Sequence, residues 1–162
     1  MIVVAFDQVS KQIALKLLTP FEPYSFLPLF NFSLTFNKGA AFSLLSNAGG
    51  WQRWFFTILA IGVGIFILFW LKKLTSKEKL LALSLTMILG GAIGNVIDRL
   101  LYGHVVDFID WFYYSTTGCL PFFYGLNNST CHWPTFNIAD SAIFIGAVLM
   151  IIQAIFYNKP ES

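Results

Sequence analysis

Residues 136–157 begin with Phe136-Asn137-Ile138-Ala139-Asp140-Ser141 and continue as an apolar segment broken only by Gln153. Asp140 therefore stands at the start of a segment that could lie in lipid. An ionisable side chain costs roughly 3 kcal/mol or more at the centre of a bilayer and less near its ends. Such a residue is a functional candidate by default, so a polar partner for Asp140 has to be sought elsewhere in the chain.

The composition of the whole chain is that of an integral membrane protein. Of 162 residues, 57% are hydrophobic and 11% are charged, whereas a soluble domain carries about 25% charged residues. The net charge of +2 is too small to indicate a nucleic-acid partner. Two cysteines cannot form a thiolate metal cluster, and the spacing of His104 and His132 matches no zinc motif. We therefore expect no metal.

Apolar runs predict an all-α membrane bundle of about four transmembrane helices, forming one domain over residues 1–162. The N-terminal run is the weakest because Asp7 and Lys11 interrupt it. Lys11 could reach an interface along its aliphatic stem, whereas Asp7 has to face the interior of the bundle. The expected helices cover residues 1–18, 54–71, 80–99 and 138–157, and the outer segments cover residues 19–53 and 100–137.

The distribution of lysines predicts the orientation of the bundle. The connection 72–79 holds the densest basic cluster, so the positive-inside rule places it in the cytoplasm. Both termini are then cytoplasmic. Asp98, Asp107 and Asp140 all fall near the outer face of the membrane.

The two outer segments differ in character. Three prolines break helix in residues 19–53, and residues 30–36 alternate apolar and polar side chains with the period of a strand. The segment Asn37-Lys38-Gly39-Ala40-Ala41-Phe42 is typical of a turn. We therefore predict a small β-rich platform on the extracytoplasmic side. Residues 108–136 are rich in aromatic rings, which favours an interfacial belt over a specific lipid-binding role.

Cys119 and Cys131 both lie in the second outer segment. Because the outer compartment of a bacterium is oxidising, a disulfide between them is favoured over two buried thiols. It would close a short loop and could contribute roughly 3 kcal/mol.

Two Asn-x-x-Asp pairs are the strongest internal signal. Asn95 and Asp98 share one helix face, and Asn137 and Asp140 repeat the spacing. A helix cap would explain Asn137, which stands at a predicted helix start. A helix cap explains Asp98 poorly, because the helix dipole disfavours an anion at the C-terminal end, where Asp98 is predicted to stand. We expect Asp110 to be a solvated charge and His104 to be a surface histidine.

Acid–base catalysis by a pair of carboxylates is the simplest chemistry that these residues could perform. When two acids share a site, one is ionised and the other protonated near neutral pH, because like charges oppose double ionisation. The ionised acid can take a proton from water, and the protonated acid can polarise a carbonyl and later protonate a leaving amine.

Five short motifs follow one another along nearly the whole chain. They are Asp7-Gln8-Val9-Ser10-Lys11, Asn37 to Phe42, Gly94-Asn95-Val96-Ile97-Asp98-Arg99, Val105-Val106-Asp107-Phe108 and Phe136 to Ser141. Together and in this order they resemble the bacterial lipoprotein signal peptidase (signal peptidase II) family. The resemblance implies an aspartic endopeptidase of the bacterial inner membrane that needs no cofactor. Such an enzyme removes the signal peptide from a diacylglyceryl-modified prolipoprotein by cutting N-terminal to the lipidated cysteine.

The resemblance also implies roles for individual residues. Asp107 and Asp140 would be the catalytic pair, with Asp98 a second candidate for one of the two positions. Asn37 would help to hold the peptide, and Asp7 and Lys11 would support the architecture of the site. The residues expected to orient the acids and the substrate backbone are Asn95, Asp98, Arg99 and Asn137.

Two other classes of function remain open at this point. A small proton-coupled transporter could use the buried acids as a relay, and a purely structural membrane protein would leave the Asn-x-x-Asp pairs unexplained. A peptidase would have the lipid-modified prolipoprotein and membrane lipids as its partners, and we expect a monomer. One departure from the family is a longer stretch between Asp107 and Asp140, in the region 115–131, which contains both cysteines.

Overall fold

The computed structural model describes residues 2–39, 49–127 and 129–156. Part of the predicted turn at 37–42 and the end of the last predicted helix, at 157, lie outside the described residues. The elements are α1 (Ile2–Leu17), β1 (Tyr24–Leu27), β2 (Phe30–Asn37), α2 (Trp51–Lys73), α3 (Lys79–Leu101), β3 (Val105–Tyr114), β4 (Tyr124–Asn127), β5 (Thr130–His132) and α4 (Ile138–Phe156).

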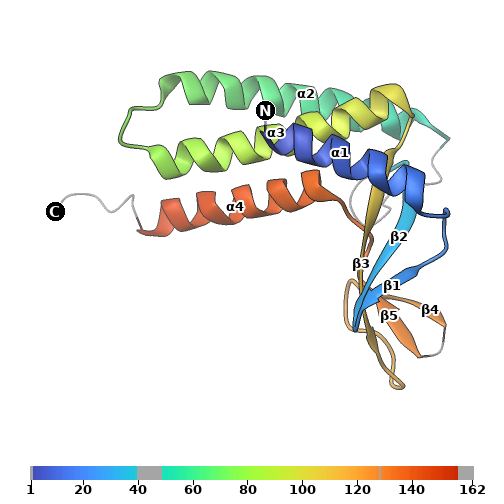
Figure 1. Cartoon of the computed structure of the whole chain (residues 1–162). Coiled ribbons are helices and arrows are strands. Elements are labelled where there is room, and N and C mark those ends of the chain that lie inside the picture. Colours follow the sequence, from blue (N-terminus) through green and yellow to red (C-terminus); the bar gives the residue numbers. More distant parts are fainter. Residues whose placement is uncertain (1, 40–48, 128, 157–162) are drawn as a thin grey trace.

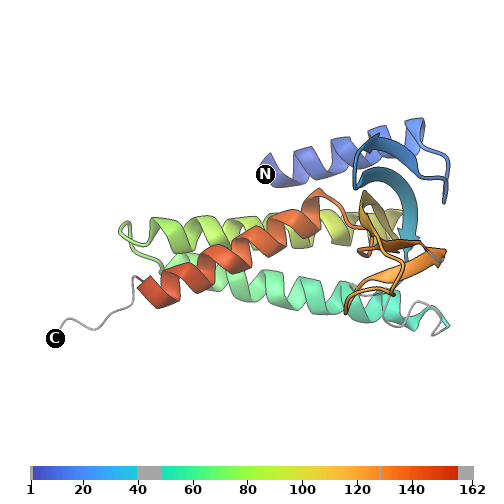
Figure 2. The same cartoon turned by 90° about the horizontal axis from the view of Figure 1, so that it is seen from below.

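The helices lie side by side, and the sheet stands at one end of the bundle (Figures 1 and 2). Among the described residues, α2, α3 and α4 are long and apolar enough to cross a membrane, and α1, at 16 residues, is shorter. All four predicted helices are present, with bounds within a few residues of those expected. The apolar runs located them because a helix in lipid satisfies every backbone hydrogen bond internally.

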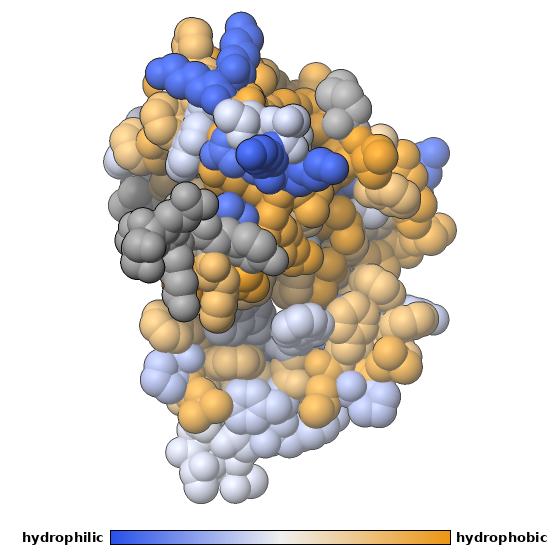
Figure 3. All heavy atoms as spheres, turned by 90° about the vertical axis from the view of Figure 1, so that its left-hand side faces the viewer, coloured by the Kyte–Doolittle hydropathy of each residue, from blue (hydrophilic) through white to orange (hydrophobic). Residues whose placement is uncertain are grey.

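The surface of the bundle is apolar, except at one end. α2 exposes large apolar side chains on most of its circumference, including Phe55, Ile58 and Phe66. Figure 3 looks onto the end of the bundle that carries the connection between α2 and α3, where hydrophilic residues gather. Lys72 and Lys73 are exposed there, as are Lys77 and Lys79.

Helix α1 has its polar face inside. Its buried residues are Asp7, Lys11 and Ala14, which share one face, while Phe6 and Ile13 are among the apolar residues exposed on the opposite side. Asp7 faces the interior of the bundle, as predicted. The expectation that Lys11 extends to an interface was wrong, because the buried carboxylates of Asp7 and Asp98 lie within 2.9 Å and 2.8 Å of its ammonium group.

Small residues on α3 allow the helices to approach closely. A Cβ atom on Gly91 would collide with the carbonyl oxygen of Ala139 in α4, and one on Gly94 would lie 2.5 Å from an Asp7 carboxylate oxygen. α3 therefore packs against α1 on one side and α4 on another, and the polar residues of all three helices can meet.

The sheet is larger than the predicted platform. Five antiparallel strands are arranged in the order β1-β2-β3-β5-β4. The predicted strand at 30–36 is confirmed as β2. The central strand β3 was not predicted: residues 105–108 are buried in succession and show no alternation, and the aromatic run that follows had been interpreted as a belt. The all-α description is thus incomplete, since strands occupy much of 105–132.

The hairpin of β4 and β5 follows the loop 115–123 and lies in the stretch that contains both cysteines. Cys119 and Cys131 form the predicted disulfide, which ties the loop after β3 to β5. Another tie is a hydrogen bond from the Leu120 amide to the Tyr113 hydroxyl, 2.6 Å long. This hairpin continues through residues 133–137 directly into α4.

Candidate active site

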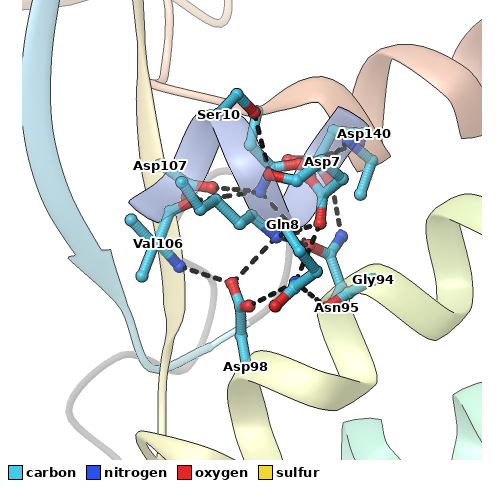
Figure 4. A network of polar contacts seen from close by, with 12 residues as sticks. Asp7, Gln8, Ser10, Gly94, Asn95, Asp98, Val106, Asp107 and Asp140 are labelled. Atoms are coloured by element: carbon cyan, nitrogen blue, oxygen red, sulfur yellow. Dashed lines mark hydrogen bonds and ion pairs between the residues drawn. The ribbon is translucent and has the colours of Figure 1, made fainter. Parts of the chain in front are cut away.

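The predicted site residues converge where α1, α3 and α4 meet β3 (Figure 4). Asp7 and Gln8 come from α1, Asn95 and Asp98 from α3, Asp107 from β3, and Asp140 from the first turn of α4. A left-handed turn at Gly103, with φ of 82°, takes the chain from α3 into β3. It brings the Val106 amide to 3.0 Å from an Asp98 carboxylate oxygen, which fixes the start of β3 on the end of α3.

Asp107 is almost completely enclosed, with 1% of its surface exposed. The Asn137 amide donates to its Oδ1 over 2.6 Å, and the Asn37 side chain also hydrogen-bonds it. Burial, and next the negative charge of Asp140, raise the pKa of the Asp107 carboxyl well above its usual value, and the two amides only partly oppose this shift. Asp107 therefore favours its protonated form.

Asp140 is held in the first turn of α4 by two asparagines. Its backbone amide donates to the Asn137 Oδ1 over 2.9 Å, and the Asn95 Nδ2 donates to its carboxylate over 2.7 Å. The helix N-terminus favours a negative charge at this position. The predicted cap at Asn137 is confirmed, and the same side chain also donates to Asp107, so one asparagine links both acids.

The amide orientations of these two asparagines are fixed by their other contacts. Asn95 Oδ1 accepts from the Lys11 ammonium over 3.0 Å and from Asn137 over 3.2 Å, which leaves its Nδ2 to face Asp140. Asn137 Oδ1 caps α4, which leaves its Nδ2 to face Asp107. Each acid thus receives a donor that cannot turn away without breaking another hydrogen bond.

Asp98 lies apart from the two acids. It pairs with Lys11 and also accepts from Gln8 over 2.9 Å, in addition to the Val106 amide. The carboxylate of Asp7 pairs with the same Lys11 ammonium group, and it also accepts a hydrogen bond from the Ala139 amide over 2.9 Å. The structure thus places Asp98 as a counter-ion of Lys11, and Asp107 as the acid that shares a contact with Asp140.

Gln8 also belongs to this network, although the sequence alone gave no reason to assign it a role. Its Nε2 lies within hydrogen-bond distance of Asp7, Asp98 and the Gly94 carbonyl oxygen. Its position directly after Asp7, in the first motif, was the only available signal. A glutamine one residue from a buried acid cannot be assigned to the same face by helical spacing, since neighbouring residues do not share a face.

Arg99 stands at the edge of the site. Its guanidinium donates to the Gly39 carbonyl oxygen over 3.3 Å and lies 5.8 Å from the centre of the Phe56 ring. The Nε atom is buried and has no hydrogen-bond partner among the described residues. A peptide carbonyl is the kind of group that such a donor binds.

Asp110 is not the solvated charge that the sequence predicted. It has 2% of its surface exposed and pairs with His132, whose Nδ1 lies 2.9 Å from the Asp110 Oδ1. The prediction was wrong because position 110 belongs to β3, whose buried face includes it. His104 is half-buried between the rings of Phe36 and Tyr102, and burial lowers its pKa.

The fold and the site define a class of protein: a membrane-embedded hydrolase with two acids at one end of an apolar bundle. The family model for signal peptidase (SPase) II matches residues 1–156, and the chain belongs to this family of membrane aspartic peptidases. The lipoprotein signal peptidase of Alteromonas mediterranea is 49% identical over 91% of this chain and 72% of its own. That of Burkholderia mallei is 48% identical over 93% and 81%.

Solved structures agree with this assignment. Two structures described as a bacterial membrane enzyme, at 2.3 Å and 1.9 Å resolution, are each 32% identical to this chain, with TM-scores of 0.77 and 0.74. They cover 99% and 96% of this chain, and 88% of their own chains. These relatives do not support the transporter that the sequence had left open.

Proposed function

We propose that this protein removes signal peptides from diacylglyceryl-modified prolipoproteins, cutting N-terminal to the lipidated cysteine, with Asp107 and Asp140 as the catalytic pair. One observation carries the assignment of the pair: Asn137 caps the helix at Asp140 and donates to Asp107, so the two acids share one rigid contact. Family membership supplies the reaction.

The two acids take different parts in peptide hydrolysis. Asp140, in its ionised form, accepts a proton from water as the water oxygen attacks the scissile carbonyl carbon. Asp107, which favours its protonated form, donates its proton to the carbonyl oxygen. When the tetrahedral intermediate collapses, the C–N bond breaks and the leaving amine takes the proton from Asp140. Asp107 recovers its proton from the hydroxyl that becomes the new carbonyl, and both acids return to their starting forms.

The remaining polar residues hold the substrate or the acids. Arg99 and Asn37 bind the peptide backbone, because they stand at the edge of the site and Arg99 retains a free donor in the described part of the chain. Asn95 and Asn137 orient the acids. Asp7, Lys11 and Asp98 support the site by joining α1 to α3.

In the bacterial inner membrane, we propose four spans with both termini in the cytoplasm. α1 is the fourth span, because its apolar side chains face outward while Asp7 and Lys11 face inward. The exposed lysines between α2 and α3 lie in the cytoplasm, so the site and the sheet lie near the outer face. A monomer takes up its lipid-anchored substrate sideways from the membrane, with the acyl chains against the apolar helix faces.

Cleavage of a diacylglyceryl-modified prolipoprotein by the purified protein tests this proposal. Wild type is compared with Asp107→Asn, Asp140→Asn and Asp98→Asn, and folding is checked for each. We expect cleavage by wild type, its loss in the first two variants and its partial retention in the third. Loss with Asp98→Asn but not with Asp107→Asn would reassign the pair. No cleavage by folded wild type, with lipidation of the substrate confirmed, would overturn the proposal.

A further inference from the structure

The pair of Asp110 and His132 is a second buried polar cluster, and the reaction described above does not use it. Both Asp110 carboxylate oxygens lie near the His132 Nδ1, at 2.9 Å and 3.1 Å, and the Asn31 Nδ2 donates to Oδ2 over 3.2 Å. The His132 ring stacks on Phe112, with ring centres 5.3 Å apart. The cluster therefore joins β2, β3 and β5.

Asp110 is held by the same two chain segments as Asp107. On β2, Asn31 donates to Asp110, and Asn37 hydrogen-bonds Asp107. On the segment from β5 to α4, His132 pairs with Asp110, and Asn137 donates to Asp107. Two acids three residues apart on β3 are thus fixed in parallel by the two neighbouring segments.

The segment between His132 and Asn137 runs tightly along β3. The Phe136 carbonyl oxygen accepts from the Phe108 and Ile109 amides, and the Phe136 amide donates to the Ile109 carbonyl oxygen. The Thr135 hydroxyl lies 2.6 Å from that of Thr35 in β2. A displacement of β5 at His132 would therefore be transmitted over five residues to Asn137 and to the start of α4.

From this arrangement we infer that Asp110 and His132 form a positioning pair, which fixes the segment carrying Asp140 against the strand carrying Asp107. The inference rests on the proposed function of those two acids. A hydrogen-bonded pair in a water-excluded position resists displacement strongly, because its partners cannot be replaced by solvent. Two acids that act on one carbonyl need their geometry held to a fraction of an ångström. His132 and Asp110 do not contact the substrate themselves.

The test compares kcat and KM for cleavage of a lipidated prolipoprotein by variants of the full-length protein. His132→Phe keeps the ring on Phe112 but removes the donor, and we expect kcat to fall about tenfold or more with KM unchanged. His132→Asn places an amide donor near the position of Nδ1, and we expect it to restore most of kcat. A double-mutant cycle with Asp110→Ala should be non-additive, since either change breaks the same pair.

Tyr113→Phe is the matched control. It removes a hydrogen bond from the same sheet, but one that ties only the loop before β4, so kcat should not change. Should His132→Phe not fold, Asp110→Asn/His132→Phe leaves no unpaired buried charge and takes its place. If wild type cleaves, Asp107→Asn does not, and the folded His132 variant keeps its kcat, the positioning role is wrong and the proposed function stands. Failure of wild type itself to cleave would overturn both.

Discussion

Asp107 and Asp110 stand three residues apart on one strand and are buried to nearly the same degree, with 1% and 2% of their surfaces exposed. Each accepts a hydrogen bond from an asparagine of β2 and from the segment that leads into α4. They differ in the second titratable group: Asp107 has the carboxylate of Asp140 nearby, and Asp110 has the imidazole of His132.

Burial alone therefore does not distinguish the acid that we propose to be catalytic. A histidine beside Asp110 hydrogen-bonds its carboxylate, so the pair acts as a fixed tie between strands. Burial raises the pKa of Asp107, and the second acid beside it raises the pKa further by opposing its ionisation, which creates the asymmetry that acid–base catalysis needs.

Matched neutral substitutions at the two acids should give the largest difference. Asp107→Asn removes a proton donor, and we expect cleavage to fall by about 10²–10⁴-fold, the usual contribution of general acid–base catalysis. Asp110→Asn keeps an oxygen that can accept from His132, so we expect a loss below about tenfold. Cleavage of a lipidated prolipoprotein measures both. Equal losses in two folded variants would mean that the two acids are not functionally distinct.

Removal of the buried Lys11 ammonium group, which contacts Asn95, should mainly affect the stability of the fold. Lys11→Met leaves Asp7 and Asp98 buried without their counter-ion, which should lower the free energy of unfolding by about 3–5 kcal/mol. Titration of the protein in mixed micelles with a denaturing detergent measures this loss. Lys16→Met, at an exposed position on the same helix, serves as the control and should change stability by less than about 0.5 kcal/mol. Similar losses in both variants would contradict the buried ion pairs.

Opening the disulfide should weaken the side of the sheet that carries Asp110. Cys119→Ser/Cys131→Ser releases a loop with a sequence separation of 12 and should cost about 3 kcal/mol. Hydrogen exchange at Thr130–His132 should accelerate while exchange in α3 stays slow. Cleavage should persist at a reduced rate, because the strand that carries His132 becomes more mobile while the bond between His132 and Asp110 remains. Complete loss of cleavage in a folded protein would mean that the hairpin itself acts on the substrate.

Forcing α3 and α4 apart should disturb the part of the site that carries Asp140. Gly91→Ala places a methyl group against the Ala139 carbonyl oxygen, and we expect a loss of about 1–3 kcal/mol, the usual cost of overpacking, together with reduced cleavage. Gly62→Ala on α2 meets no atom within 4 Å and is the control. Thermal unfolding in detergent compares the two variants. A Gly91→Ala variant as stable as Gly62→Ala would contradict the close approach of these helices.

The raised pKa of Asp107 should appear as the smallest effect, a pH dependence of stability. Because the folded state binds this proton more tightly than the unfolded state, the stabilisation is fully present below the ordinary carboxyl pKa of 3.8 and is lost as pH rises through the folded pKa. Asp107→Asn should therefore gain stability relative to wild type as pH rises. Thermal midpoints from about pH 4 to about pH 8 measure this. A constant difference between the two proteins would indicate an unshifted pKa.

Much of the fold followed from local patterns. The apolar runs predicted the four helices, and the alternation over 30–36 predicted β2. The central strand β3 could not be recognised, because its early residues are buried without alternation and resemble any other apolar run. The same ambiguity hid the burial of Asp110, since a charged residue at the end of such a run is usually solvated.

For the site, the spacing of Asn137 and Asp140 predicted the helix cap, and the buried position of Asp7 followed from the cost of an acid in lipid. Gln8 and the pairing of His132 with Asp110 could not be predicted. Both depend on contacts between residues at least 22 positions apart in the chain, and no local spacing encodes them.

Composition, periodicity and short motifs are local properties of the chain, so they were enough to predict a membrane protein, the approximate positions of its helices and the family it resembles. The contact between Asp107 and Asp140 through Asn137, the position of Lys11 between two carboxylates and the burial of Asp110 emerged only in the folded structure. These outcomes depend on how closely α1, α3, α4 and β3 approach one another. That approach is set by small residues such as Gly91 and Gly94 at the places where the elements cross.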